Sequence, residues 1–182
     1  MPLVAVDVQT LPMLHTDDAV SLISDMGITR YRLEAKVWDI YSNEGDTYWH
    51  FPKKIHVERF DSLFRVIGSI VADTAYYFVG NGLWHAIGNV VVKTLEGRIF
   101  ETSELFWDQK APQNSVNAFY TDRPVKVTEP DGTIIYGLKG FRADQNLTVY
   151  RLFEMKGEFN VKESTDSLRQ DTTGRSVNKQ IP

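Results

Sequence analysis

Histidine is the first residue type to consider for chemistry, because imidazole can bind metals and move protons near neutral pH. His50 and His56 are six residues apart, so in a regular strand they would share one face. Glu58 would lie on that face too, and the three could form a metal-binding patch. The commoner explanation of such a pattern is the polar face of a solvated strand, so we expect no metal site.

Carboxylates offer a second candidate chemistry. Glu101, Glu104 and Asp108 are close in sequence, and glycosidases use two carboxyl groups about 5–9 Å apart. Outward-facing acids are common on strands, however, and the chain has no cysteine, nucleophile elbow, P-loop or His-Glu-x-x-His motif. The sequence therefore predicts a protein that is not an enzyme and needs no cofactor.

The content of aromatic side chains is the more distinctive feature of the sequence. The 182 residues include four Trp, ten Phe and eight Tyr. Core packing accounts for most of them, but they could also line an interior that is incompletely filled and ready for a lipid. That alternative depends on which elements carry these residues.

The elements that carry them have the pattern of antiparallel β-sheet. Between Ala75 and Asp108, three runs of β-branched and aromatic residues alternate with period two and are separated by turns at Gly80-Asn-Gly82 and Leu95-Glu-Gly97. Val20–Ser24 is also predicted as a strand, although Thr16 could instead cap a short helix there. The other predicted strands are Ile28–Tyr41, Tyr48–Phe60, Phe64–Ala72, Val116–Glu129, Thr133–Arg142 and Leu147–Val161.

A repeat of about 35 residues underlies these strands. A spacing of 35 positions separates successive turn residues, which are Gly27, Ser62, Gly97 and Gly132. The same spacing separates the strand residues Ile55, Val90 and Val125. Such a repeat indicates stacked β layers with two open ends, whose edge strands can pair with another chain.

Composition and charge restrict the class of protein further. The net charge of −4 argues against a nucleic-acid partner. The first basic residue is Arg30, and no stretch has the length of a membrane span, so no signal peptide or anchor is predicted in this chain. We expect an extended segment over 1–19, one β domain over 20–162 and a disordered polar tail over 163–182.

Five segments in order resemble a known family. They are Gly27-Ile-Thr-Arg-Tyr-Arg-Leu-Glu-Ala35, Tyr48-Trp-His-Phe-Pro52, Leu83-Trp-His-Ala-Ile-Gly-Asn-Val90, Leu105-Phe-Trp-Asp108 and Tyr136-Gly-Leu-Lys139. The region from about Val20 to Val161 is thereby similar to LptC, the periplasmic lipopolysaccharide-export component of the OstA/LptA-like superfamily, and particularly to its Bacteroidetes branch. The tail has no counterpart in that pattern.

The resemblance implies a twisted, V-shaped antiparallel β-jellyroll that carries lipid A acyl chains in an apolar slot. It implies a periplasmic protein anchored to the inner membrane by a segment absent here. The N-terminal part would meet an LptB/LptF/LptG-type ABC exporter, and the C-terminal edge strand would meet an LptA-like bridge protein. Gly27 and Gly137 match family glycines and are expected at turns or close backbone approaches.

Strand phase selects the residues expected to line the slot, and one register error would turn a whole set outward. They are Tyr31, Leu33, Phe51, Ile55, Val57, Phe64, Val66, Val90 and Val125. Two other functions stay open: a soluble LptA-like bridge protein, and a β-sandwich carbohydrate-binding module or glycosidase that uses exposed tryptophans and paired carboxylates.

Overall fold

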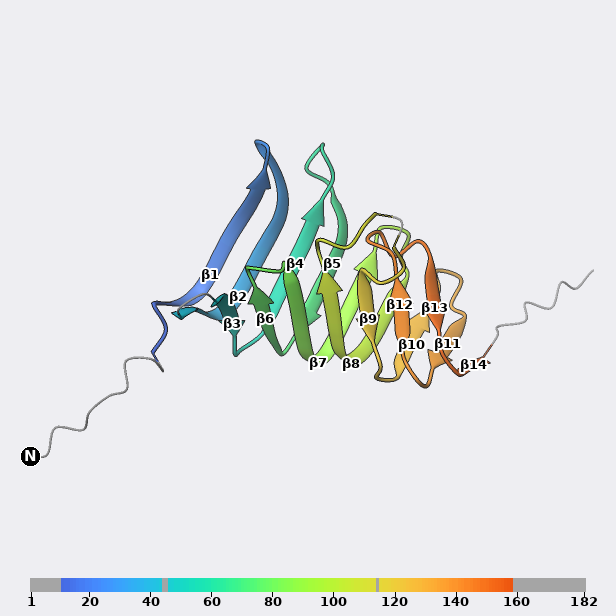
Figure 1. The fold of residues 1–182 in the computed structure, drawn as a ribbon. Helices are drawn as coiled ribbons and strands as arrows, with labels where there is room; N and C mark the ends of the chain where they lie inside the picture. Colours follow the sequence, from blue (N-terminus) through green and yellow to red (C-terminus); the bar gives the residue numbers. More distant parts are fainter. Residues whose placement is uncertain (1–10, 44–45, 114, 159–182) are drawn as a thin grey trace, which may run out of the picture.

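The computed structural model describes residues 11–43, 46–113 and 115–158, and this part of the chain is all β (Figure 1). Every strand pairing within it is antiparallel. The strands are β1 (Leu14–Asp25), β2 (Ile28–Asn43), β3 (Asp46–Phe51), β4 (Ile55–Phe60), β5 (Val66–Ala72), β6 (Thr74–Phe78), β7 (Leu83–Thr94), β8 (Ile99–Asp108), β9 (Phe119–Thr121), β10 (Val125–Thr128), β11 (Ile134–Gly137), β12 (Phe141–Ala143), β13 (Tyr150–Leu152) and β14 (Met155–Glu158).

The strands form two facing layers, because four long strands each contribute one half to either layer. Layer A contains the halves of β1, β2, β7 and β8 next to the turns at 25–28 and 95–98, and its strand order is β1-β2-β4-β5-β7-β8-β10-β11-β14. Layer B contains their other halves, and its strand order is β1-β2-β3-β6-β7-β8-β9-β12-β13. The result is the predicted β-jellyroll-like fold, with β1 and β14 at opposite ends (Figure 1).

The chain passes from one layer to the other at a line of corners. Asp18, Lys54 and Asn89 adopt positive φ at successive corners, with φ of 48°, 40° and 43°. Backbone hydrogen bonds continue around the bend, from Lys54 N to Asp73 O at 2.7 Å and from Asp73 N to Gly88 O at 2.9 Å. These bonds pair backbone groups of neighbouring strands where the sheet folds over.

The hairpin turns of layer A repeat one geometry, but the first equivalent position is Phe64, two residues after the predicted Ser62. The amides of Phe64, Gly97 and Gly132 donate to Asp61, Thr94 and Glu129, respectively, three residues back in the same type of turn. All three residues have positive φ, of 60°, 88° and 86°. Each turn therefore repeats the same geometry after roughly one repeat length.

Several predicted strands have the wrong boundaries. The segment 48–60 is divided into β3 and β4 at the corner after Phe51, and 116–129 is divided into β9 and β10. The segments 133–142 and 147–161 are divided in the same way. Alternation continues across a corner, so the period-two pattern conceals the corner.

The strand predicted at 20–24 is confirmed, but β1 begins at Leu14, inside the segment predicted to be extended. The predicted tail, 163–182, lies outside the described residues.

Candidate functional site: the space between the layers

A row of aromatic side chains crosses the inner face of layer B, one from each neighbouring strand. Antiparallel register places Trp49 opposite Tyr77, Tyr77 opposite Trp84, and Trp84 opposite Trp107. The ring centroids of these pairs are 4.9, 4.7 and 6.4 Å apart, and Phe119 extends the row 5.3 Å beyond Trp107. Such cross-strand pairs stabilise the sheet and also form a continuous apolar wall.

Layer A faces this wall mainly with aliphatic side chains. Leu33 on β2, Val57 on β4 and Val92 on β7 are all at least nine-tenths buried. Tyr31 bridges the two layers, with its ring centroid 5.6 Å from that of Trp107 in an edge-to-face contact. Burial raises the pKa of the Tyr31 hydroxyl. The space between the layers is therefore apolar on both sides.

Three adjoining cavities remain in this space. They measure about 80, 20 and 40 Å³, and all three are lined by Val57 and Trp107. Trp84 lines the first two, and Tyr31 lines the first and third. A cavity of about 10–15 Å³ on this measure admits one water, so the three cavities hold a few waters and are too small for an acyl chain. A lipid chain would enter only if side chains or layers moved apart.

The indole nitrogen of Trp84 is an unsatisfied donor at these cavities. Trp84 is 7% exposed, and within the described ranges its Nε1 has no hydrogen-bond partner. A buried N–H without an acceptor costs about 1–3 kcal/mol. The N–H therefore offers a hydrogen bond to an oxygen atom that enters the space.

The turn between β12 and β13, residues 144–149, closes one end of the space. Gln145 is buried and its side chain accepts a hydrogen bond from Trp107 Nε1 at 3.0 Å and donates one to Asp108 O at 2.7 Å. From layer A, Arg59 Nη1 donates to Gln145 O at 2.8 Å, and Nη2 donates to Asn146 Oδ1 at 3.1 Å. Arg59 thus ties the two layers together.

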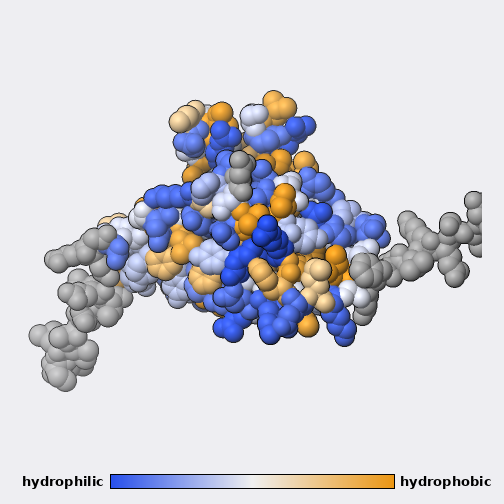
Figure 2. Space-filling view, turned by 45° about the vertical axis from the view of Figure 1, so that its right-hand side comes forward, coloured by the Kyte–Doolittle hydropathy of each residue, from blue (hydrophilic) through white to orange (hydrophobic). Residues whose placement is uncertain are grey.

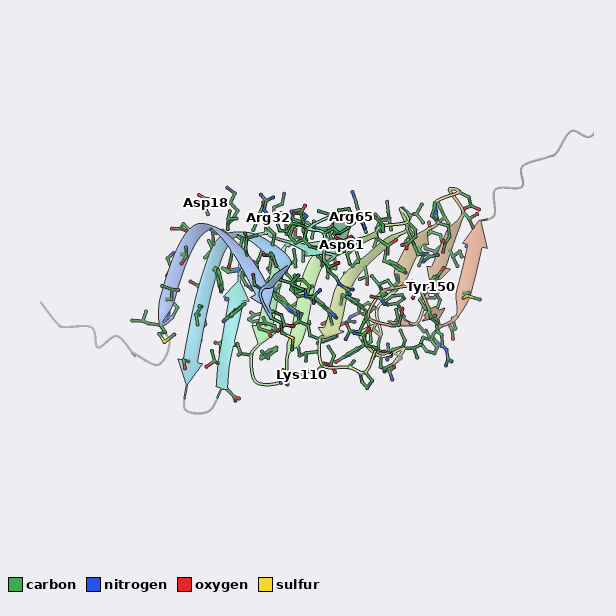
Figure 3. All side chains as sticks on the ribbon, turned by 90° about the horizontal axis from the view of Figure 1, so that it is seen from above. Asp18, Arg32, Asp61, Arg65, Lys110 and Tyr150 are labelled. Atoms are coloured by element: carbon green, nitrogen blue, oxygen red, sulfur yellow. The ribbon has the colours of Figure 1, made fainter. Side chains whose placement is uncertain are left out.

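A second polar cluster holds the far side of this turn. Arg98 Nε donates to both carboxylate oxygens of Glu129 at 2.9 Å, and Arg98 Nη1 donates to Leu147 O at 3.2 Å. Tyr150 donates its hydroxyl proton to the same carboxylate. Figure 3 shows Tyr150 between the two sides of the molecule, toward the end that holds β13 and β14.

We predict a pH dependence from this cluster. Burial, together with the hydrogen bond to Glu129, raises the pKa of Tyr150 from 10.0 to about 12. Because the folded state holds this proton more tightly, the stabilisation is present below pH 10 and is lost as the pH rises toward 12. Tyr150→Phe should therefore flatten the fall in stability between these pH values, as measured by urea unfolding. The difference in absorbance at 295 nm between wild type and Tyr150→Phe isolates this tyrosine, and a difference that titrates near pH 10 in the folded protein would contradict the prediction.

Most of the predicted slot residues lie between the layers. Leu33, Phe51, Ile55, Val57, Val90 and Val125 are buried in one core cluster, and Tyr31 packs against it. The inward direction predicted for Phe64 and Val66 is wrong, because their exposed fractions are 56% and 44%.

A β-bulge explains the outward direction of Val66, and the adjoining turn explains that of Phe64. The register between β4 and β5 shifts at Arg59/Phe60, so Phe60 pairs with Val66 whereas Arg59 pairs with Gly68. The extra residue, Ile67, lines the cavity in place of Val66. Phe64 occupies the turn position that glycine holds in the next two repeats, and its ring stacks on Phe60 at 4.4 Å. A bulge changes which side chains point inward without altering the sequence pattern.

Two matched valine substitutions test this assignment. Val57→Ala removes two buried methyl groups next to existing cavities and should lower the free energy of unfolding by about 2 kcal/mol. Val66→Ala removes the same atoms from an exposed position and should cost no more than about 0.5 kcal/mol. Chemical denaturation measures both. Equal losses would show that Val66 faces the interior.

Gly27 and Gly137, expected at a turn or a close backbone approach, have different backbone roles, and the structure confirms both positions. Gly27 has φ of 77° in the β1–β2 turn, with nothing near the position of a Cβ. At Gly137, a Cβ would lie 2.8 Å from Gly140 O and 2.9 Å from a Leu152 side-chain carbon. Gly27 thus serves a turn and Gly137 a close approach.

The candidate histidines do not come together. His50 lies on β3 in layer B and stacks on Tyr76, whereas His56 lies on β4 in layer A near Glu34. The corner at Pro52–Lys54 separates them. Within the described part of the chain, no group of three or more His, Asp or Glu side chains has a metal-binding arrangement.

The candidate carboxylates are also distributed over different partners. Glu101 pairs with Lys126 at 2.8 Å, and Glu104 pairs with His85 and Arg123 at 2.8 and 3.0 Å. The hydrogen bond from His85, followed by that from Arg123, lowers the pKa of Glu104. Neither acid lines the three cavities between the layers.

Sequence reasoning did not select the aromatic row or Arg59. The tryptophans are evident in the sequence, but their alignment depends on the register of strands up to 70 residues apart. Arg59 follows Ile55 and Val57 in phase, so a charged residue at an inward position was the available signal.

Exposed apolar side chains gather on the hairpin turns of layer A. Met26, Leu63 and Leu95 are 93%, 71% and 66% exposed in three successive turns. The β1–β2 and β4–β5 turns rise above the rest of the molecule in Figure 1, and Figure 2 shows hydrophobic side chains at the two raised tips. We call these three exposed side chains the apolar rim; none of them lines the three cavities between the layers.

No family model and no curated protein matches this chain. Among residues 11–43, 46–113 and 115–158, there is no helix with the length and apolar character needed to cross a bilayer.

Proposed function

We propose that this chain is a non-enzymatic lipopolysaccharide-transfer module of the LptC type. The observation that carries the proposal is the row of three cavities between two apolar layers, all lined by Val57 and Trp107. The apolar rim at Met26, Leu63 and Leu95 offers exposed apolar side chains that acyl chains would contact before they enter that space. The unsatisfied Trp84 N–H offers a hydrogen bond to an ester or hydroxyl oxygen.

An apolar space of this kind suits the transfer of lipid acyl chains through water. Moving one CH₂ group out of water is worth about 0.8 kcal/mol, so a chain of about twelve carbons represents on the order of 10 kcal/mol. A lipid with several chains does not cross water unaided. An apolar space that opens between two layers removes this barrier without a chemical step.

The two ends of the sheet fit a relay between proteins. β1 is a twelve-residue strand that pairs only with β2 among the described strands, and β14 pairs only with β11. An edge strand can extend a sheet into another protein. In this proposal the N-terminal end contacts an LptB/LptF/LptG-type ABC exporter in the inner membrane, and the C-terminal edge contacts an LptA-like bridge protein in the periplasm.

A soluble LptA-like bridge protein is the nearest alternative, because it would use the same space and edges. The two functions differ in membrane attachment. Fractionation of the native protein distinguishes them, since the transfer module should remain with the inner membrane in high salt.

A carbohydrate-binding module has less support. Sugar rings stack on the open faces of aromatic side chains, but rings on the outer face of layer B cover one another. His50 stacks on Tyr76 at 4.4 Å, and Phe106 stacks between His85 and Tyr120 at 4.2 and 5.1 Å. These rings have little free face to offer a sugar.

Site-specific photo-crosslinking tests the proposed function. A benzophenone amino acid in place of Tyr31 would lie at the cavities, whereas one in place of Arg32 would lie on the outer face of layer A. We expect position 31 to capture lipopolysaccharide, and an LptA-like jellyroll protein should displace the lipid. No capture by the folded protein, or equal capture at position 32, would contradict the proposal.

A further inference from the structure

Arg59 is a charged residue at an inward-facing strand position, beside the apolar space between the layers. Its Cα lies opposite that of Tyr31 in the β2–β4 ladder, so its side chain leaves β4 on the inner side. It lines the 40 Å³ cavity beside Val57, Ile70 and Trp107. A cation at an inward strand position normally needs a partner of opposite charge.

The partners of Arg59 are neutral. Its guanidinium donates to the Gln145 carbonyl and to the Asn146 side chain, and within the described ranges it forms no ion pair. No acidic residue lines this cavity. The other basic residue there, Lys93, pairs with Ser69 in the outward-facing set of the β5–β7 ladder. Arg59 is half-buried and Asn146 is exposed, so the positive charge lies at the solvent-facing edge of the cavity, where no acidic side chain of the lining neutralises it.

We infer that Arg59 and the 144–149 turn form the site that recognises the anionic group of an amphiphile, whose apolar chain lies against Trp107 between the layers. A phosphate or carboxylate forms charge-assisted, bidentate hydrogen bonds with a guanidinium, and these are stronger than its bonds to neutral acceptors. The anion would replace the Gln145 and Asn146 oxygens on Arg59 and release this tie between the layers. This inference rests on the proposed function.

The test compares two detergents with the same chain. Dodecyl phosphate, dodecyl maltoside and inorganic phosphate are titrated below micelle-forming concentrations into the whole protein, and binding is measured by calorimetry. Wild type should bind dodecyl phosphate about tenfold or more tightly than the maltoside. Inorganic phosphate alone should not compete, because it lacks the apolar chain.

Variants assign the preference to one side chain. Arg59→Gln should reduce the ratio of the two affinities to near one, and Arg59→Lys should restore it in part. The matched control is Arg65→Gln on the same hairpin, since Arg65 is 73% exposed and ion-paired with Asp61. This control should keep the wild-type ratio. A purely structural role of Arg59 would change both affinities together.

The outcomes separate this inference from the proposed function. If both detergents bind equally to wild type, or Arg59→Gln keeps the preference, the inference fails and lipid carriage stands. Competition by inorganic phosphate alone would make the site a free-anion site and also overturn the inference. If neither detergent binds, both proposals fail. The wild-type comparison decides the matter even if Arg59→Gln does not fold.

Discussion

Gly140→Ala should destabilise the protein more than any other small substitution, by about 4 kcal/mol. Gly140 lies in the corner between β11 and β12 with φ of 113°, a conformation that L residues rarely adopt. An added Cβ would lie 2.4 Å from Thr121 O and 3.0 Å from Asp122 Cα. Both atoms belong to the backbone of the neighbouring corner, so neither can move aside cheaply. Urea unfolding followed by circular dichroism measures the loss.

Gly97→Ala is the matched control for backbone strain. Gly97 has φ of 88° in the β7–β8 turn, but nothing lies within 4 Å of its Cβ position. The substitution should cost about 1–2 kcal/mol from conformation alone. The difference between the two variants therefore isolates the steric contribution of the corner. Equal losses would mean that the two corners can separate and that the layer junction is loose.

The second large effect is expected for Trp107→Ala, with a loss of about 3–5 kcal/mol. Trp107 is 5% exposed, and its ring contacts Tyr31 and Phe119 at centroid distances of 5.6 and 5.3 Å. The truncation would also leave the buried Gln145 side chain without its bond from the indole N–H. The same unfolding measurement applies, with Trp107→Leu as a milder variant.

Trp84→Phe provides the contrast. Trp84 is almost as buried as Trp107, but its N–H has no acceptor in the described structure. Phenylalanine would remove an unsatisfied donor and keep a ring in the row, so the change in stability should stay within about 1 kcal/mol. A large loss at Trp84 would reveal an acceptor for its N–H, and a small loss at Trp107 would show that the row contributes little.

Trp107 also links stability to the proposed function. Because Trp107 borders the two cavities that no charged side chain lines, Trp107→Ala would join them into one larger apolar void. Such voids stay dry and bind small apolar molecules. In the native protein the same volume has to be made by side-chain movement or by separation of the layers. The Arg59 contacts to the 144–149 turn oppose that separation.

The amino-acid sequence alone was enough to predict the all-β class, the layered repeat and most inward-facing residues. These features are local, because alternation assigns each residue to one side of a strand and small residues with positive φ mark the turns. Leu33, Phe51 and Val90 are accordingly in the core. Gly97 and Gly132 are in turns of the same geometry.

Other features depended on the tertiary structure. The corner at Lys54 divides an apparently continuous strand, and the bulge opposite Arg59 turns Val66 outward. Arg59 meets Gln145 across 86 residues of sequence. A period-two pattern reports the side on which a residue lies, but it contains no information on which strand is adjacent or where the chain changes layer. Long-range pairing decides both, and with them the shape of the space between the layers.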